Sequence, residues 1–138
     1  MSDAILRSLS TLDGHAPHYE FLYKDLRQIV QNKKSEGRTR VRFVSSALRN
    51  RDDPQFRHVS LEFFVPNEDR TCDFYCCEKY SLSMSSDWRD EFAITLPNVP
   101  YSIEELVLLE ADLPRMYLIG YMDCRHHVRS MLKRMYSS

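Results

Sequence analysis

The first third of the chain repeats its apolar residues every three or four positions, which is the period of an amphipathic helix. Residues 3–13 place Ile5 and Leu9 on one stripe, and residues 17–34 carry a second stripe between a first-turn proline and two closing lysines. These patterns predict two helices. The first helix, within residues 1–14, is short enough to be an appended interaction element.

From residue 38 the hydrophobic pattern changes to strict alternation, the period of a strand with one buried face. It predicts strands over residues 38–43 and 58–65, a third extended stretch over 72–84 and a short fourth strand over 92–96. A proline-containing turn is predicted at residues 66–69. Because the connections between neighbouring strands are short, we expect an antiparallel meander.

The helical period returns after two prolines, which we expect to close the sheet. Ser102 and Glu105 have the spacing of a capping box, which predicts a helix over residues 103–112. A last helix is predicted over residues 116–136, where a glycine leaves the alternative that 116–121 is a strand.

The 138 residues fit one α+β domain, a four-stranded antiparallel meander flanked by N- and C-terminal helices. This element order over residues 16–136, with a proline pair after the last strand, resembles the RWD and ubiquitin-conjugating group of folds. The resemblance implies a partner-binding scaffold. None of the cysteines lies in the usual sequence context of a ubiquitin-conjugating catalytic cysteine, so we do not expect that activity.

The formal net charge of −1 conceals blocks of opposite sign. Lysines and arginines exceed acids by six over residues 24–57, acids exceed bases by nine over residues 61–112, and residues 113–138 carry an excess of four bases. Such blocks can neutralise one another in the folded chain, or they can leave a basic face for an acidic partner.

Three of the four cysteines lie within six residues, a spacing unlike a disulfide framework. Four residues are candidate zinc ligands: Cys72, Cys76, Cys124 and His127. However, a C-x-x-x-C pair on a strand spaces its sulfurs too widely for one zinc ion, so we expect no metal. Candidates for thiol catalysis are Cys76, Cys77 or Cys124 as nucleophile with His58, His126 or His127 as base. No family signature surrounds them, so small core-forming side chains are the simpler interpretation.

Other catalytic signals are missing from the sequence. Only three glycines are present, which excludes a Gly-rich phosphate loop, and no spacing singles out a pair of catalytic carboxylates. We therefore assign no catalytic residue, cofactor or small-molecule substrate, and we favour a protein that is not an enzyme.

A basic and aromatic sheet face would suit single-stranded RNA. Alternation places Phe64 and Tyr75 on the same outer face as three arginines of the first strand. The residues expected to hold phosphates are Arg38, Arg40, Arg42, Lys33 and Lys34. Glu62 can instead pair across the strands with one of these arginines, which would leave an ordinary solvated face. The corresponding function is that of a small RNA-binding or regulatory protein, such as a viral one.

Protein binding is the interpretation that we rank first, because the chain has eight tyrosines, seven phenylalanines, one tryptophan and six methionines. The candidate contacts are Ile5, Leu9, Phe64, Tyr75, Trp88 in a polar loop, Met131 and Met135. For each of them, packing in the protein's own core is the alternative. We therefore predict a non-catalytic adaptor or complex subunit that binds another protein or a second copy of itself.

The predicted location is the cytosol or the nucleus. Residues 1–12 carry polar side chains throughout, unlike the apolar segment of a signal peptide. No run of residues without charge approaches the roughly 20 apolar residues of a membrane helix. We therefore expect no membrane partner.

Overall fold

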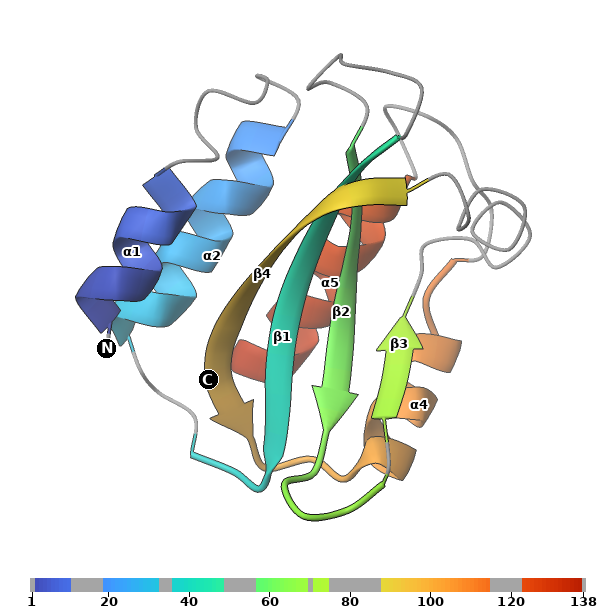
Figure 1. Ribbon diagram of the computed structural model, residues 1–138. Coiled ribbons are helices and arrows are strands. Elements are labelled where there is room, and N and C mark those ends of the chain that lie inside the picture. Colours follow the sequence, from blue (N-terminus) through green and yellow to red (C-terminus); the bar gives the residue numbers. More distant parts are fainter. Residues whose placement is uncertain are drawn as a thin grey trace.

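The computed structural model describes residues 2–10, 19–32, 36–48, 57–69, 71–74, 88–114 and 123–137. Its elements are α1 (Ser2–Ser10), α2 (Glu20–Asn32), β1 (Thr39–Leu48), β2 (Arg57–Phe64), β3 (Thr71–Phe74), β4 (Trp88–Val99), α4 (Ile103–Ala111) and α5 (Cys124–Tyr136) (Figure 1). Helices flank an antiparallel sheet, which confirms the predicted α+β class.

The described strands form one sheet in the spatial order β3-β2-β1-β4. The first three follow one another as a meander, but β4 pairs with β1 instead of β3, so the predicted meander is wrong for the last strand. The physical reason is apolar matching, because Ile94 and Leu96 of β4 lie opposite Phe43 and Val41 and extend the buried face of the sheet. The resemblance to the RWD group, which rested on a meander, is not confirmed.

Strands β1 and β4 are both longer than the sequence predicts. β1 continues to Leu48 because its second half pairs with β2 on one side and with β4 on the other. Trp88, expected in a polar loop, is instead the first residue of β4 and lies opposite Leu48. Pro97, expected to end the sheet, lies within β4. It is tolerated because β4 is at the end of the strand order and the register shifts between Thr39 and Val41.

The turn after β2 confirms the prediction for residues 66–69 and is a type II turn. The backbone N–H of Glu68 donates to the carbonyl of Val65 over 3.2 Å, which closes the four-residue turn. Pro66 occupies the second position, and Asn67 at the third has a φ of 67°. Type II geometry requires this positive φ, which asparagine tolerates better than most residues.

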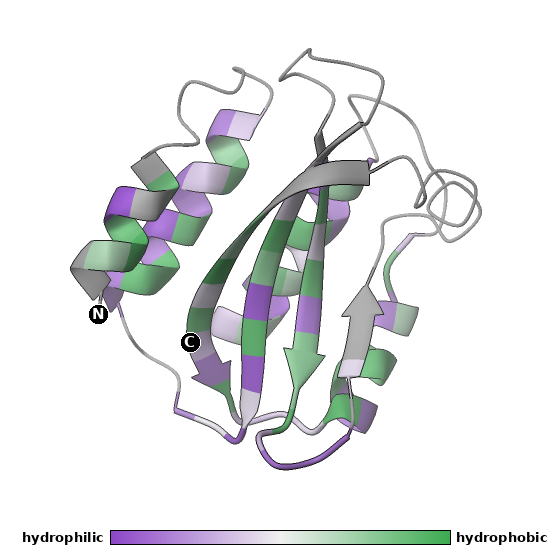
Figure 2. Cartoon of the chain, in the orientation of Figure 1, coloured by the Kyte–Doolittle hydropathy of each residue, from purple (hydrophilic) through white to green (hydrophobic). Residues whose placement is uncertain are grey.

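Helices cover one face of the sheet. Figure 1 shows α5 crossing behind β1 and β2, α4 behind β3, and α1 beside α2 near the β4 edge. The covered face of β2 carries Val59, Leu61 and Phe63, all 0% exposed, as their alternation predicts. Figure 2 shows the corresponding alternation of hydrophobic and hydrophilic residues along β1. The core therefore lies between this face and the helices.

The last two helices begin at caps. Ser102 and Glu105 form the predicted capping box of α4, in which each side chain bonds to the other residue's backbone N–H over 3.1 Å. Helix α5 begins at Cys124, later than predicted, because Asp123 is an extended N-cap residue. The helix-or-strand question for 116–121 lies outside the described residues. In the described part of the chain, no helix has the length and apolar character to cross a membrane.

Candidate interaction surfaces

The apolar stripe of α1 packs within its own chain. Leu9 is 0% exposed and belongs to the core, and Ile5 is partly buried and packs against it. Helix α1 contacts α2 and β4. The structure therefore places these two candidate contacts in or beside the core, and Leu9 does not reach the surface.

The methionine stripe of α5 is buried in the same way. Met131 is 0% exposed and Met135 is 4% exposed, and both belong to the core cluster. The outward side of the last turns carries Lys133 and Arg134, which are exposed. Since the methionines face the sheet, α5 presents a basic surface and not an adaptable apolar one.

The outer face of the sheet brings some of the predicted basic and aromatic residues together. Arg38 and Arg40 are exposed, and the guanidinium carbon of Arg40 lies 6.0 Å from the ring centroid of the half-buried Phe64. Arg42 differs from these two arginines, because its Nε donates to Glu62 Oε2 over 2.5 Å. One of the three arginines is thus neutralised by the cross-strand pair that the sequence offered as the alternative.

Only part of this outer face is open. Four residues that share it with Arg40 and Arg42 are nevertheless buried: Val44, Ser46, His58 and Ser60. Exposed residues of this face include Arg40, Thr71 and Thr95, and Ala93 on the β4 edge opposite Val44. The available area on the sheet is therefore smaller than the alternation alone implies.

Several predicted residues cannot be placed. Lys33, Lys34, Tyr75, Cys76 and Cys77 lie outside the described residues, as do the side chains of Cys72 and Trp88. Cys124 is 6% exposed and His127 is 8% exposed, with His127 Nε2 3.6 Å from Glu110 Oε1. No group of three or more candidate metal ligands occurs within the part of the chain that the structure describes.

Sequence reasoning missed the outward face of α4. Leu108 is 69% exposed and Val107 is 42% exposed, and no other large hydrophobic residue of the described segments is as exposed. The opposite side of the helix buries Ile103 and Leu106. The signal was the run of four apolar residues from Leu106 to Leu109, because four in succession must cover more than one side of a helix.

The surroundings of this apolar face are acidic. Residues 103–114 contain four carboxylates and no lysine or arginine. Glu104 and Glu105 lie in the first turn, where the helix dipole favours negative charge. Near the other end, Arg134 of α5 donates to the carbonyl of Leu109 over 3.3 Å and lies 3.8 Å from Asp112. We call Val107, Leu108 and these carboxylates the α4 patch.

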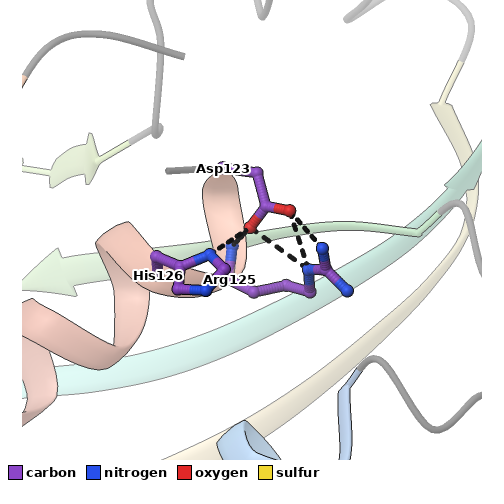
Figure 3. A network of polar contacts seen from close by, with 3 residues as sticks. All are labelled: Asp123, Arg125 and His126. Atoms are coloured by element: carbon purple, nitrogen blue, oxygen red, sulfur yellow. Dashed lines mark hydrogen bonds and ion pairs between the residues drawn. The ribbon is translucent and has the colours of Figure 1, made fainter. Parts of the chain in front are cut away.

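A second group that the sequence did not reveal is a polar network at the start of α5 (Figure 3). Asp123 is 4% exposed, and its carboxylate accepts bonds from the backbone N–H and the guanidinium Nε of Arg125 at 3.0–3.1 Å. It also lies 2.9 Å from His126 Nδ1. Burial acts to lower the pKa of Arg125, but its hydrogen bond with Asp123 and the opposite charge raise it above the ordinary value.

Arg125 and His126 of this network also contact aromatic residues at the start of α2. The guanidinium carbon of Arg125 lies 5.1 Å from the ring centroid of Tyr19, and the ring of Phe21 lies 5.3 Å from that of His126. One turn further on, Arg129 Nε donates to Asp25 over 2.6 Å. Because each of these charged groups has a packing or pairing role, we interpret the network as structural.

A groove of about 340 Å³ lies between the last turns of α2 and α5. Ile29 and Tyr136 are its partly exposed apolar residues and Leu132 is buried, whereas the other lining residues are polar: Asp25, Gln28, Asn32, Lys133 and Ser137. The hydroxyl of Tyr136 donates to the carbonyl of Pro97 in β4. Asp25 is paired with Arg129, so the exposed ammonium of Lys133 is the groove's main charge.

Comparison with known proteins gives no match to a protein-family model, to a curated protein or to a solved structure.

Proposed function

We propose that the protein is a non-catalytic protein-interaction module, an adaptor or complex subunit of the cytosol or nucleus, whose contact surface is the α4 patch. The observation that carries this proposal is the 69% exposure of Leu108 beside the 42% exposure of Val107. A helix that is apolar on all sides is normally covered on all sides. Exposed apolar residues rimmed by polar ones are typical of contact sites.

The other polar clusters give this proposal indirect support. Asp123, Arg125 and His126 resemble a catalytic arrangement only in residue type, because their hydrogen bonds fix the first turn of α5 and His126 packs against Phe21 of α2. Cys124, the thiol adjacent to them in sequence, is buried. Phe64, on the open part of the sheet face, is a second contact candidate, although its ring is already in contact with Arg40.

A photo-crosslinking residue introduced at Leu108 tests the proposal in cells of the source organism. We expect one discrete crosslinked product, identified by mass spectrometry, because the side chain would lie inside a contact. The same residue introduced at Lys24, which is exposed on α2, is the control and should give no discrete product. Equal, diffuse labelling at both positions would contradict an interaction function for α4.

RNA binding is the second candidate, and the contact of the exposed Arg40 with Phe64 is the observation that favours it. A cation over an aromatic ring on an open strand can hold a phosphate while the ring stacks on a base. Titration with a fluorescent single-stranded oligouridylate should then show affinity that falls steeply with salt. Arg40→Gln should weaken binding more than Arg42→Gln, because Glu62 already neutralises Arg42. Absence of salt-dependent binding would eliminate this candidate.

A further inference from the structure

We propose that the partner of the α4 patch is a second copy of this chain, with Leu108 of one copy inserted between α2 and α5 of the other. This inference rests on the proposed interaction function and names its partner. The chain carries both halves of such a contact. One is the exposed apolar side chain of Leu108 on α4, and the other is a partly apolar groove that lies elsewhere on the same molecule.

The two surfaces are complementary in shape and polarity. The groove of about 340 Å³ is at the small end of the range for ligand pockets, which suits an amino-acid side chain better than a large ligand. Ile29 and Tyr136, which are partly exposed in the groove, offer apolar contacts for the aliphatic side chain of Leu108. Insertion would remove from water the large hydrophobic residue that is most exposed in the described part of the chain.

The charges are complementary as well. The α4 patch has carboxylates and no cation of its own helix, whereas Lys133 is exposed at the groove. The proposal places Glu104 of one copy against Lys133 of the other. The attraction between acidic α4 and basic α5 already occurs within one chain, where Arg134 lies 3.8 Å from Asp112. A net charge of −1 leaves little overall repulsion between two copies.

The positions of the two surfaces allow the contact to be made twice. Arg134 of α5 contacts α4, and the preceding residue, Lys133, lines the groove beside α2. Both surfaces therefore border the last turns of α5. In a dimer with two-fold symmetry, each copy would supply one α4 patch and one groove, and both pairs would be satisfied. A contact of this small size predicts weak, concentration-dependent association.

Sedimentation equilibrium of the full chain over a wide concentration range tests the proposal. The apparent mass should rise toward that of two chains, and Leu108→Lys should reduce the association constant at least about tenfold, because it replaces the aliphatic contact with an ammonium group beside Lys133. Circular dichroism and thermal unfolding check that the variant remains folded, which we expect because Leu108 is 69% exposed.

Exchanging the charges of Glu104 and Lys133 gives a second, independent test of the contact. Glu104→Lys and Lys133→Glu should each weaken association about tenfold or more, because each creates two like-charge contacts in the dimer. An equimolar mixture of the two variants should associate as well as the wild type, since every pair then joins opposite charges. Lys24→Glu makes the same charge change at an exposed position of α2 that does not line the groove and should leave association unchanged.

Other results would overturn the inference. A wild-type chain that remains monomeric at the highest concentration refutes a second copy as partner, and so does association that Leu108→Lys leaves intact. Failure of the mixture to restore association refutes the Glu104–Lys133 contact. If the crosslink from position 108 identifies a different protein, the self-association inference fails while the proposed interaction function stands. If no discrete crosslink forms and the chain is monomeric, both fail.

Discussion

Helices α4 and α5 follow one another among the described elements, but α5 buries its apolar residues and α4 leaves some of them exposed. In α5 the residues Val128, Met131, Leu132 and Met135 recur at three and four and are all buried. In α4 the apolar residues surround the helix, and Leu108 and Val107 remain outside the core. A helix with apolar residues on one side can bury all of them against its own sheet. An all-round apolar helix needs a further surface that the described part of the chain does not supply.

The first turns of the two helices also differ in how deeply they are buried. Each has an N-cap side chain that accepts a backbone N–H at 3.1 Å, Ser102 in α4 and Asp123 in α5. The first is exposed, whereas the second is 4% exposed and holds the buried guanidinium of Arg125. The same local chemistry should therefore contribute unequally to stability, and the following substitutions measure the inequality.

The largest effect is expected from Arg125→Ala. It leaves the carboxylate of Asp123 buried without its guanidinium partner, and breaking a buried pair in this way costs about 3–5 kcal/mol. The matched control is Arg129→Ala one turn later, whose pair with Asp25 has side chains 37% and 23% exposed. We expect about 1 kcal/mol or less there. Urea unfolding of both variants gives the comparison, and equal losses would show that the start of α5 is not specially stabilised.

The two faces of α4 provide the next test, with the same chemical change at both positions. Leu106→Ala removes a side chain that is 0% exposed, so we expect a loss of about 2–5 kcal/mol from the lost burial and the cavity. Leu108→Ala removes one that is 69% exposed and should change the stability of the single chain by no more than about 0.5 kcal/mol. The measurement is urea unfolding at a protein concentration where the chain is monomeric. Similar losses at both positions would mean that Leu108 is covered within its own chain.

The sequence predicts this contrast only in part. The period of three and four identified α5 and the buried face of α2, and alternation identified the core residues of β2, because burial in one layer imposes a regular pattern. Long-range pairing is not written in any local pattern. β4 pairs with β1, which is far from it in the sequence, because their apolar residues match. The short connections between neighbouring strands predict only pairs of consecutive strands.

The candidate sites were harder to predict than the fold. An apolar stripe has the same spacing whether it packs on its own sheet or on a partner, so Leu9, Met131 and Met135 were offered as contacts although they are buried. The capping box predicts where the helix over residues 103–112 begins, but it does not predict that Leu108 faces away from the core. The Asp123 network depends on how α2 and α5 approach each other, which a single sequence does not reveal.

The cap of α4 should have a smaller effect than either core change. Ser102→Ala removes the hydroxyl that accepts the N–H of Glu105, and loss of an N-cap typically costs about 1 kcal/mol. Ser102→Gly should cost only a few tenths as much, because glycine is itself acceptable at an N-cap. Urea unfolding distinguishes the two. A loss in Ser102→Ala as large as in Arg125→Ala would remove the difference between the two helix starts.

The end of α5 gives the smallest effect at neutral pH and one that depends on pH. Tyr136 donates its hydroxyl to the carbonyl of Pro97, and burial raises the pKa of its phenol above the ordinary value. Removing the hydroxyl in Tyr136→Phe should cost about 1 kcal/mol or less at pH 7. At the end of α4, by contrast, the described contact is between Arg134 and Asp112, whose side chains are 38% and 77% exposed.

Alkaline pH should then reverse the order of wild type and Tyr136→Phe. The folded chain keeps the Tyr136 proton while the unfolded phenol loses it above a pH of about 10, so the folded state binds more protons and wild-type stability falls as pH rises. The variant lacks this contribution, and all its other residues are the same as in the wild type. The stability difference should therefore be constant from neutral pH to about pH 9 and shrink steadily above it. A difference that stays constant at higher pH would mean that the phenol ionises as readily in the folded chain as in the unfolded one. The end of α5 would then be as accessible to solvent as the end of α4.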